Sequence, residues 1–294
     1  MPIHVTEGVE DTMFIDSHVH FWRLDRNHPI AISRAIGGLT RDFLPDDLRP
    51  LCQPLGVSRV VLVQAAPSLD ETRYLLDLAR QDDLIAGVVG WVDLEADDVP
   101  AVLDSLRGQP RFVGIRALPA EIPAPHWLAR PSVRRGLRAL AEAGLSLDLL
   151  VRSDQLAEGL EVLDAIPDLR ADINHCGRPV IVCREWEPWA STMREIAQRT
   201  PTVCKLSGLI ERGGFTWSVE DLKPYVGHLL SCFGAERLMF ASNWPVLNLT
   251  GTYRRWWDGL QAVLEGFGIS DADRLAIFRG TATRFYRLAR TVRG

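Results

Sequence analysis

The sequence predicts a single (β/α)8 barrel, and three observations support this fold class. Short apolar runs typical of strands alternate with amphipathic segments typical of helices, and eight such pairs follow one another along the 294 residues. Most of the strand runs are almost continuously hydrophobic, as parallel strands covered on both faces require. No glycine-rich phosphate loop follows a strand, which disfavours the open doubly wound sheet, the main alternative. One domain over residues 1–294 accounts for the whole pattern.

The first half of the chain contains four predicted strands, each based on a run of apolar residues. The first strand alternates in polarity, whereas the second is almost continuously apolar. The first helix has Asp46 or Asp47 as a candidate N-terminal cap. The predicted strands are 14–20, 59–65, 85–92 and 112–117, and the predicted helices are 46–55, 70–81, 97–106 and 131–143.

The second half repeats the same order of elements. The predicted strands are 145–151, 169–175, 202–207 and 237–242; one helix opens near residue 153, others span 189–199 and 219–232, and two or three follow the last strand. Long loops at residues 22–45, 118–130 and 209–218 follow the first, fourth and seventh strands. We expect these loops to determine which ligand is bound.

Composition excludes several classes of partner. The chain is 47% hydrophobic and 24% charged, so it can bury a sizeable core. A net charge of -5 argues against nucleic acid and against an anionic membrane surface. The five cysteines are scattered and include no Cys-x-x-Cys pair, which is typical of reduced thiols in a cytoplasmic protein. The expected partner is a small molecule, and the sequence is compatible with a homo-oligomer.

The first strand contains the most informative motif, Asp16-x-His18-x-His20. In a regular strand, residues of one parity share a face, so Phe14, Asp16, His18 and His20 are expected on the same side. Two imidazoles at a strand end can converge on a metal ion or on one substrate group. Asp16 below them can hold a ring N–H. The alternative is a partly exposed strand end that carries two histidines.

Polar residues also stand at the ends of the other predicted strands. Because barrel active sites lie at the C-terminal ends of the strands, these positions predict the site. They are Gln64, Trp91, Arg116, His175, Lys205 and Asn243. Each has a structural alternative: Arg116 could pair with a carboxylate, Lys205 could point outward, and Gln64 could bind a loop. His18, His20 and His175 would supply three neutral nitrogen ligands for zinc if they converge.

Four tryptophans near the strand ends could form an apolar wall for a sugar ring. They are Trp22, Trp91, Trp186 and Trp244. Aromatic faces stack on the C–H surfaces of sugars, but the same residues are equally compatible with ordinary barrel packing.

Three segments, 16–22, 174–179 and 237–246, resemble the signature segments of the amidohydrolase superfamily. They are most similar to its lactonase branch, the group of sugar-lactone hydrolases and 2-pyrone-4,6-dicarboxylate lactonase-like proteins. Residues 112–116 resemble the fourth-strand segment of that branch, and the resemblance extends from Phe14 to about Leu288. It implies a (β/α)8 barrel that hydrolyses an intramolecular ester of a sugar acid or a related carboxylate.

The resemblance also implies roles for individual residues. His18 and His20 match the strand-one pair, His175 matches the strand-six histidine, and Arg116 matches a residue that grips a substrate oxygen or carboxylate. In metal-dependent relatives such histidines bind a divalent ion, often zinc, whereas in several lactonases they contact the substrate carbonyl without a metal. The expected cofactor is therefore at most one divalent metal ion, weakly or partly bound.

One position departs from the family pattern. The strand-eight segment of the family usually reads Ser-Asp-Trp-Pro, and its aspartate is the expected base that activates water. This chain has Asn243, and a carboxamide cannot accept a proton at neutral pH. Three explanations remain: another base, namely His175, Asp16 or a metal-bound hydroxide; a barrel that binds without turnover; or an engineered substitution. We favour another base, because the other expected site residues are present.

The expected reaction is the attack of an activated water on a lactone carbonyl. Arg116 and Gln64 would hold the substrate, His18, His20 or an ion would polarise the carbonyl, and Lys205 would neutralise the developing charge. A metal-dependent decarboxylase of the same superfamily and a non-catalytic sugar-acid-binding barrel are the alternatives.

Overall fold

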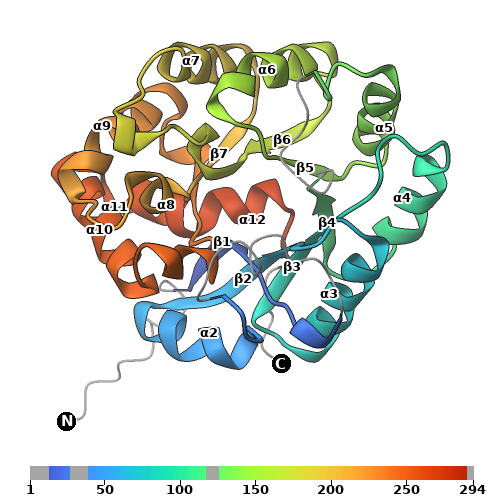
Figure 1. The fold of residues 1–294 in the computed structure, drawn as a ribbon, viewed down its shortest axis with the longest axis horizontal. Helices are drawn as coiled ribbons and strands as arrows, with labels where there is room; N and C mark the ends of the chain where they lie inside the picture. The colour runs from blue at the N-terminus through green and yellow to red at the C-terminus, as the bar shows by residue number, and fades with distance from the viewer. Residues whose placement is uncertain (1–12, 27–38, 117–125, 290–294) are drawn as a thin grey trace, which may run out of the picture.

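The computed structural model describes residues 13–26, 39–116 and 126–289, which form a ring of eight parallel strands surrounded by helices (Figure 1). The strands are hydrogen-bonded in chain order, which confirms the predicted (β/α)8 barrel. Parts of the predicted loops 22–45 and 118–130 lie outside the described residues. The strands are β1 (Phe14–Val19), β2 (Val57–Val63), β3 (Ile85–Gly90), β4 (Phe112–Ile115), β5 (Ser146–Leu149), β6 (Arg170–Ile173), β7 (Val203–Leu206) and β8 (Leu238–Phe240).

The helices include every predicted one and one addition. They are α2 (Pro45–Cys52), α3 (Leu69–Gln81), α4 (Val99–Arg107), α5 (Pro131–Glu142), α6 (Leu156–Ala165), α7 (Trp189–Arg199), α8 (Leu209–Gly213), α9 (Val219–Phe233), α10 (Tyr253–Gly266), α11 (Asp271–Leu275) and α12 (Thr281–Phe285). The addition is α8, which begins directly after β7 inside a predicted loop. No helix in the described part of the chain is long and apolar enough to cross a bilayer.

Helix starts follow local side-chain chemistry. Ser68 accepts a hydrogen bond from the amide of Glu71 at 3.1 Å and so caps α3, and Ser218 and Thr252 cap α9 and α10 in the same way. The cap predicted at Asp46 or Asp47 is wrong, because α2 begins at Pro45. Asp47 lies in the first turn instead, where its carboxylate accepts from the amide of Leu44 at 2.9 Å.

The strands end one or two residues earlier than predicted, so most of the polar residues at their ends lie on the first turns of the loops, whereas His18 and Lys205 lie within β1 and β7. His175 and Asn243 have φ angles of 53° and 61°, which belong to the left-handed region and end the β conformation. Gly208 makes the approach to His175 possible, because a Cβ at this glycine would lie 2.5 Å from the Cβ of His175.

The barrel interior is layered. An apolar layer fills the end where the strands begin, and Tyr286, just after α12, packs into it. Figure 1 shows α12 across the middle of the ring. This layer comprises Ile15, Val61, Val63, Ala86, Val89, Val203, Met239, Ala282, Tyr286 and Leu288. The larger core lies between the strands and the outer helices.

The expected common face of Phe14, Asp16, His18 and His20 is wrong. Ile15 belongs to the interior layer, whereas the ring of Phe14 packs on Phe278 at a centroid distance of 5.5 Å, within the outer group of aromatic side chains. A regular alternation continued from Ile15 would therefore turn both histidines away from the interior.

One extra residue in β1 restores their direction. Asp16 pairs with Val60 and Val19 pairs with Leu62, so three steps along β1 oppose two steps along β2. Such a bulge reverses the parity of the residues that follow it. His18 consequently points into the barrel, where its ring approaches Lys205 of β7.

Asp16 closes the barrel between β8 and β1. One carboxylate oxygen accepts from the amides of Ser242 at 2.9 Å and His18 at 3.1 Å, and the other accepts from the Tyr253 hydroxyl at 2.9 Å. Burial raises the pKa of Asp16 to about 6, against the effect of these donors. Among the described residues Asp16 binds backbone amides and a tyrosine hydroxyl but no imidazole nitrogen, so the predicted contact to the ring of His18 or His20 is wrong.

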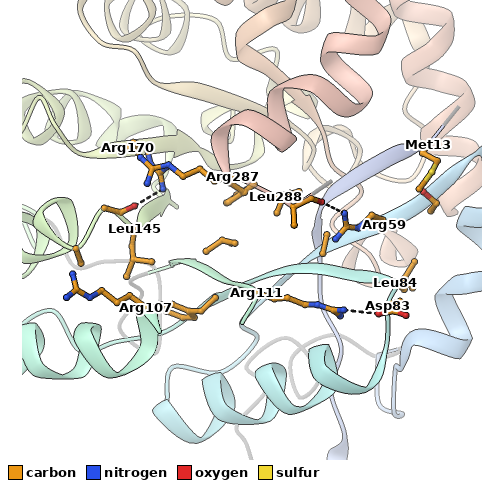
Figure 2. Close-up of a pocket in the computed structure, with 18 of the residues that line it drawn as sticks. Met13, Arg59, Asp83, Leu84, Arg107, Arg111, Leu145, Arg170, Arg287 and Leu288 are labelled. Carbon is orange, nitrogen blue, oxygen red and sulfur yellow. Dashed lines mark hydrogen bonds and ion pairs between the residues drawn. The ribbon is translucent and has the colours of Figure 1, made fainter. Parts of the chain in front are cut away.

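A cavity of about 1030 Å³ lies at the opposite end of the barrel from the histidines (Figure 2). Arg59, Arg107, Arg111, Arg170 and Arg287 are among its lining residues. Arg111 donates to the carbonyl of Ile85 at 3.0 Å, and Arg170 donates to that of Gly144 at 2.9 Å. Arg111 and Arg170 therefore satisfy backbone carbonyl groups near the starts of the strands, which is a structural role.

Replacing Asp16 tests its role in closing the barrel. Asp16→Ala leaves three buried donors without an acceptor, so we expect it to lower the free energy of unfolding by about 3 kcal/mol or more. Tyr253→Phe removes one of these bonds and should cost about 1 kcal/mol. Urea unfolding of both variants measures the difference, and equal stabilities would contradict the closing role of the carboxylate.

Candidate active site

The histidines form a chain of contacts at the C-terminal end of the barrel. His20 donates from Nδ1 to the carbonyl of Val63 at 2.8 Å, which leaves its Nε2 as an acceptor. His18 Nε2 lies 3.2 Å from that atom, and Lys205 Nζ lies 3.2 Å from His18 Nδ1. An ammonium only donates, so Nδ1 of His18 accepts from Lys205, while its Nε2 lies between His20 Nε2 and the Arg116 guanidinium.

The three imidazoles are neutral at physiological pH. Burial holds the pKa of His18 and of His175 well below the usual value, and nearby cations lower both further. Burial and then Arg116 lower the pKa of His20 to about 3. A base with so low a pKa removes a proton from water poorly, which argues against His175 as the replacement base.

Lys205 lies one layer below the mouth of the barrel and has no solvent exposure. Its ammonium pairs with Asp148 of β5, and it lies 3.6 Å from Asp172 of β6. Its expected role of neutralising the charge that develops on the substrate remains a prediction. In the structure Lys205 holds the His18 ring, because its side chain is fixed by two carboxylates.

The two carboxylates below Lys205 differ in protonation. Burial and the neighbouring Asp148 charge raise the pKa of Asp172 well above its usual value. Burial alone would raise the pKa of Asp148 too, but the Lys205 charge together with hydrogen bonds from Asp172, Lys205 and Tyr286 lowers that pKa. The Tyr286 hydroxyl lies 2.8 Å from Asp148 and 3.1 Å from Asp172, so it can donate to the ionised group and accept from the protonated one.

Arg116 brings a second positive charge, besides that of Lys205, to the histidine rings. Its Nη1 lies 3.3 Å from His18 Nε2, and its Nη2 donates to the carbonyl of Gln64. Burial lowers the pKa of Arg116 to about 10, so the guanidinium stays protonated at pH 7. Its buried Nε has no hydrogen-bond partner among the described residues. That donor is available to a substrate oxygen.

Gln64 supports Arg116. Its side-chain amide donates to the Arg116 carbonyl at 3.2 Å, and it is 2% exposed. Gln64 therefore fixes the loop after β4. Its predicted contact with substrate remains a prediction.

The proposed tryptophan wall is only partly compatible with the structure. Trp22 and Trp244 are 2% and 1% exposed and pack edge-on against Phe43 at ring centroid distances of 5.1 and 5.4 Å. This is packing, because neither ring offers a free face. Trp91 is half-buried after β3, and Trp186 is 40% exposed. Sugar stacking by these two remains a prediction.

His175 lies beside His18, with a ring centroid distance of 4.6 Å, and its Nδ1 is 2.8 Å from the Ser207 hydroxyl. The structure thus brings His18, His20, His175 and Arg116 together. Asn243 joins them, because its side chain contacts His20.

Glu211 was not predicted as a site residue. Its carboxylate accepts a hydrogen bond from the Asn243 amide at 2.8 Å. Asp148 and Asp172 were also missed, although a charged residue inside an apolar strand run was an available signal for both. Glu211 lies in a segment predicted as a loop, which forms the short helix α8, so no sequence signal indicated that it meets strand eight.

The donor set fits a divalent ion poorly. The lone pair of His18 faces the Lys205 ammonium, and the Arg116 guanidinium lies beside the other nitrogen of that ring. No group of three or more histidine, cysteine, aspartate or glutamate side chains among the described residues is arranged to hold an ion. Asn243 adds only a neutral amide, so the positive charges around His18 oppose binding of a second cation.

The chain matches known proteins over nearly all of its length. The family model described as amidohydrolase matches residues 15–288. An L-fucono-1,5-lactonase of Burkholderia ambifaria is 36% identical, covering 95% of this chain and 97% of the relative. One of Burkholderia multivorans is 33% identical, covering 93% and 96%. A crystal structure of a Burkholderia multivorans amidohydrolase with bound zinc has a TM-score of 0.86 at 31% identity, covering 94% of this chain and 100% of that one. With a matching fold and with histidines and an arginine at the expected strand ends, this chain belongs to the amidohydrolase family.

Proposed function

We propose that the protein hydrolyses the lactone of a sugar acid, with a deoxy-aldonolactone of the L-fucono-1,5-lactone type as its substrate. The two lactonases that are 36% and 33% identical support this reaction, because each aligns over more than nine-tenths of its length. The observation that carries the proposal is the environment of Arg116. A buried guanidinium with a free Nε stands beside three neutral imidazoles at the C-terminal ends of the strands.

Arg116, the histidines and Lys205 have different roles in the proposed hydrolysis. Arg116 donates to the carbonyl oxygen of the lactone and stabilises the negative charge that develops there when water attacks. His175, which is neutral, offers a ring nitrogen to a substrate hydroxyl group, whereas Nε2 of His20 lies 3.2 Å from His18 Nε2. Lys205 keeps His18 in one orientation from below. The product is a carboxylate, and Arg116 is positioned to pair with it until release.

A resident metal is proposed to be weak or partial. Should an ion bind, His18, His20 and His175 would be its nitrogen ligands, and it would supply Lewis-acid polarisation of the carbonyl. A metal-dependent decarboxylase is disfavoured because it needs a tight donor set. We also propose that the enzyme acts on sugar-derived lactones in the cytoplasm, where its five unpaired cysteines would remain reduced.

Lactone turnover is the direct test of the proposal. Ring opening releases a proton, so a panel of aldonolactones with a pH indicator reports hydrolysis. We expect L-fucono-1,5-lactone to exceed stereoisomeric lactones by about tenfold or more in kcat/KM. Saturable binding without proton release would identify a non-catalytic sugar-acid binder instead, and release of carbon dioxide from an aromatic carboxylate would favour the decarboxylase.

The Arg116→Lys variant tests the guanidinium. Lysine keeps the charge but loses the planar fork and the free Nε donor, so kcat/KM should fall at least about tenfold, or ~1.5 kcal/mol. The fold should persist, as circular dichroism would report. Arg130→Lys is the matched control, because Arg130 is 49% exposed in its pair with Glu95. Unchanged kinetics in Arg116→Lys would give Arg116 a structural role.

Metal content provides a separate prediction. Protein purified without chelator should contain less than one equivalent of metal, and dialysis against EDTA should leave kcat/KM within about twofold. Elemental analysis before and after dialysis, with activity on the same samples, makes the measurement. A stoichiometric ion that survives the chelator, or activity that only zinc restores, would contradict the poor fit.

A further inference from the structure

Glu211 stands next to the site and has one oxygen without a partner. It belongs to α8, which begins three residues after β7, and its Oε1 accepts from Asn243 Nδ2 at 2.8 Å. Its Oε2 is buried and makes no hydrogen bond with any described residue. A buried carboxylate oxygen without a partner is costly, so such an atom usually meets a ligand or a water.

The surroundings of Glu211 suit a proton acceptor. Burial raises its pKa to about 7, although the Asn243 amide and the cations Arg178 and Arg212 act in the opposite direction. His20, just after β1, contacts the same Asn243 side chain and is neutral. A base whose pKa lies near the working pH combines adequate ionisation with adequate strength.

The other buried carboxylates are engaged elsewhere. Asp16 closes the barrel through both oxygens, and Asp148 and Asp172 are bound beneath His18 by Lys205 and Tyr286. Glu71 accepts from the backbone amide of Ala65 in the loop after β2.

We propose that Glu211 is the general base of the lactonase reaction and that Asn243 positions it. The proposal rests on the proposed function. It also explains why Asn243 replaces the usual aspartate at the end of strand eight. The carboxylate is supplied here by Glu211 of α8, and the Asn243 side chain lies between it and His20. Asn243 links the two, because its amide reaches both Glu211 and His20.

The proton balance of the step is complete. Water oxygen forms a bond to the lactone carbonyl carbon, one water proton moves to Glu211, and the carbonyl electron pair moves to the oxygen held by Arg116. Collapse of the tetrahedral intermediate breaks the bond between that carbon and the ring oxygen. Glu211 returns its proton to the ring oxygen, which becomes a hydroxyl. The new carboxylic acid releases its proton to solvent.

Two variants with pH profiles test the proposal. Glu211→Gln keeps the shape and the Asn243 contact but cannot take a proton, so kcat should fall by about 10²–10⁴-fold. In the wild type, kcat/KM should rise with pH around pH 7, because Glu211 must be ionised to act. This rising part of the pH profile is called the acidic limb. Glu211→Asp retains a carboxylate, so it should keep such a limb at a reduced rate.

Asn243→Asp provides an independent readout. It replaces the amide donor by a second carboxylate beside Glu211, and the like charge should move the limb to higher pH. Glu220→Gln is the matched control, because Glu220 is an exposed carboxylate on α9 whose side chain is 79% accessible. It should change neither the rate nor the limb.

The outcomes separate this proposal from the proposed function. An active wild type whose Glu211→Gln variant keeps its rate within about threefold and its limb unchanged overturns the role of Glu211 alone. A wild type that hydrolyses no lactone of the panel overturns both proposals. Thermal melting controls for folding, and Glu211→Gln should melt no lower than wild type because it removes a desolvated charge. If that variant does not fold, loss of the limb in Glu211→Asp overturns the role.

Discussion

The buried ammonium of Lys205 is the interaction on which the geometry of the site depends. It lies in the barrel between Asp148 and Asp172, without solvent exposure. Its remaining N–H donor points at Nδ1 of His18. An ion in such a place is tolerated only when its donors are all engaged, since removing a partner from a buried pair costs about 3–5 kcal/mol. The same requirement fixes Lys205 and, through it, the plane of the His18 ring.

Successive side-chain contacts extend from Lys205 to the mouth of the barrel and fix the orientation of the rings there. Lys205 donates to His18, His18 faces His20, and His20 donates to the Val63 carbonyl. The Val63 carbonyl thereby holds the His20 ring in one tautomer, and burial keeps the imidazoles neutral. Arg116 consequently supplies the positive charge that can stabilise a developing oxyanion. The carbonyl of Gln64, just after β2, holds its guanidinium in place.

Catalytic groups in this fold are supplied by loops on a rigid ring of strands, and a function can therefore move between neighbouring loops. The contact between Asn243 and Glu211 is an instance of two adjacent strand ends sharing one position. Gly208 contributes to the same arrangement, since only a residue without a side chain lets the β7 end approach His175 so closely.

The sequence by itself determined the repeating order of strands and helices, the family, and the group of His18, His20, His175, Arg116 and Asn243 at the strand ends. These features follow from local periodicity and from motifs, which a linear chain displays directly.

The tertiary structure decided the rest. A bulge in β1, where it pairs with β2, decided which way the His18 side chain points, because the register of a strand depends on its partner strand. Depth in the barrel, which strand tilt and stagger determine, placed Lys205 below the mouth and Trp22 within the packing. Glu211 of α8 contacts Asn243 across 32 residues of sequence, and a contact between residues so far apart in the chain has no periodic signal.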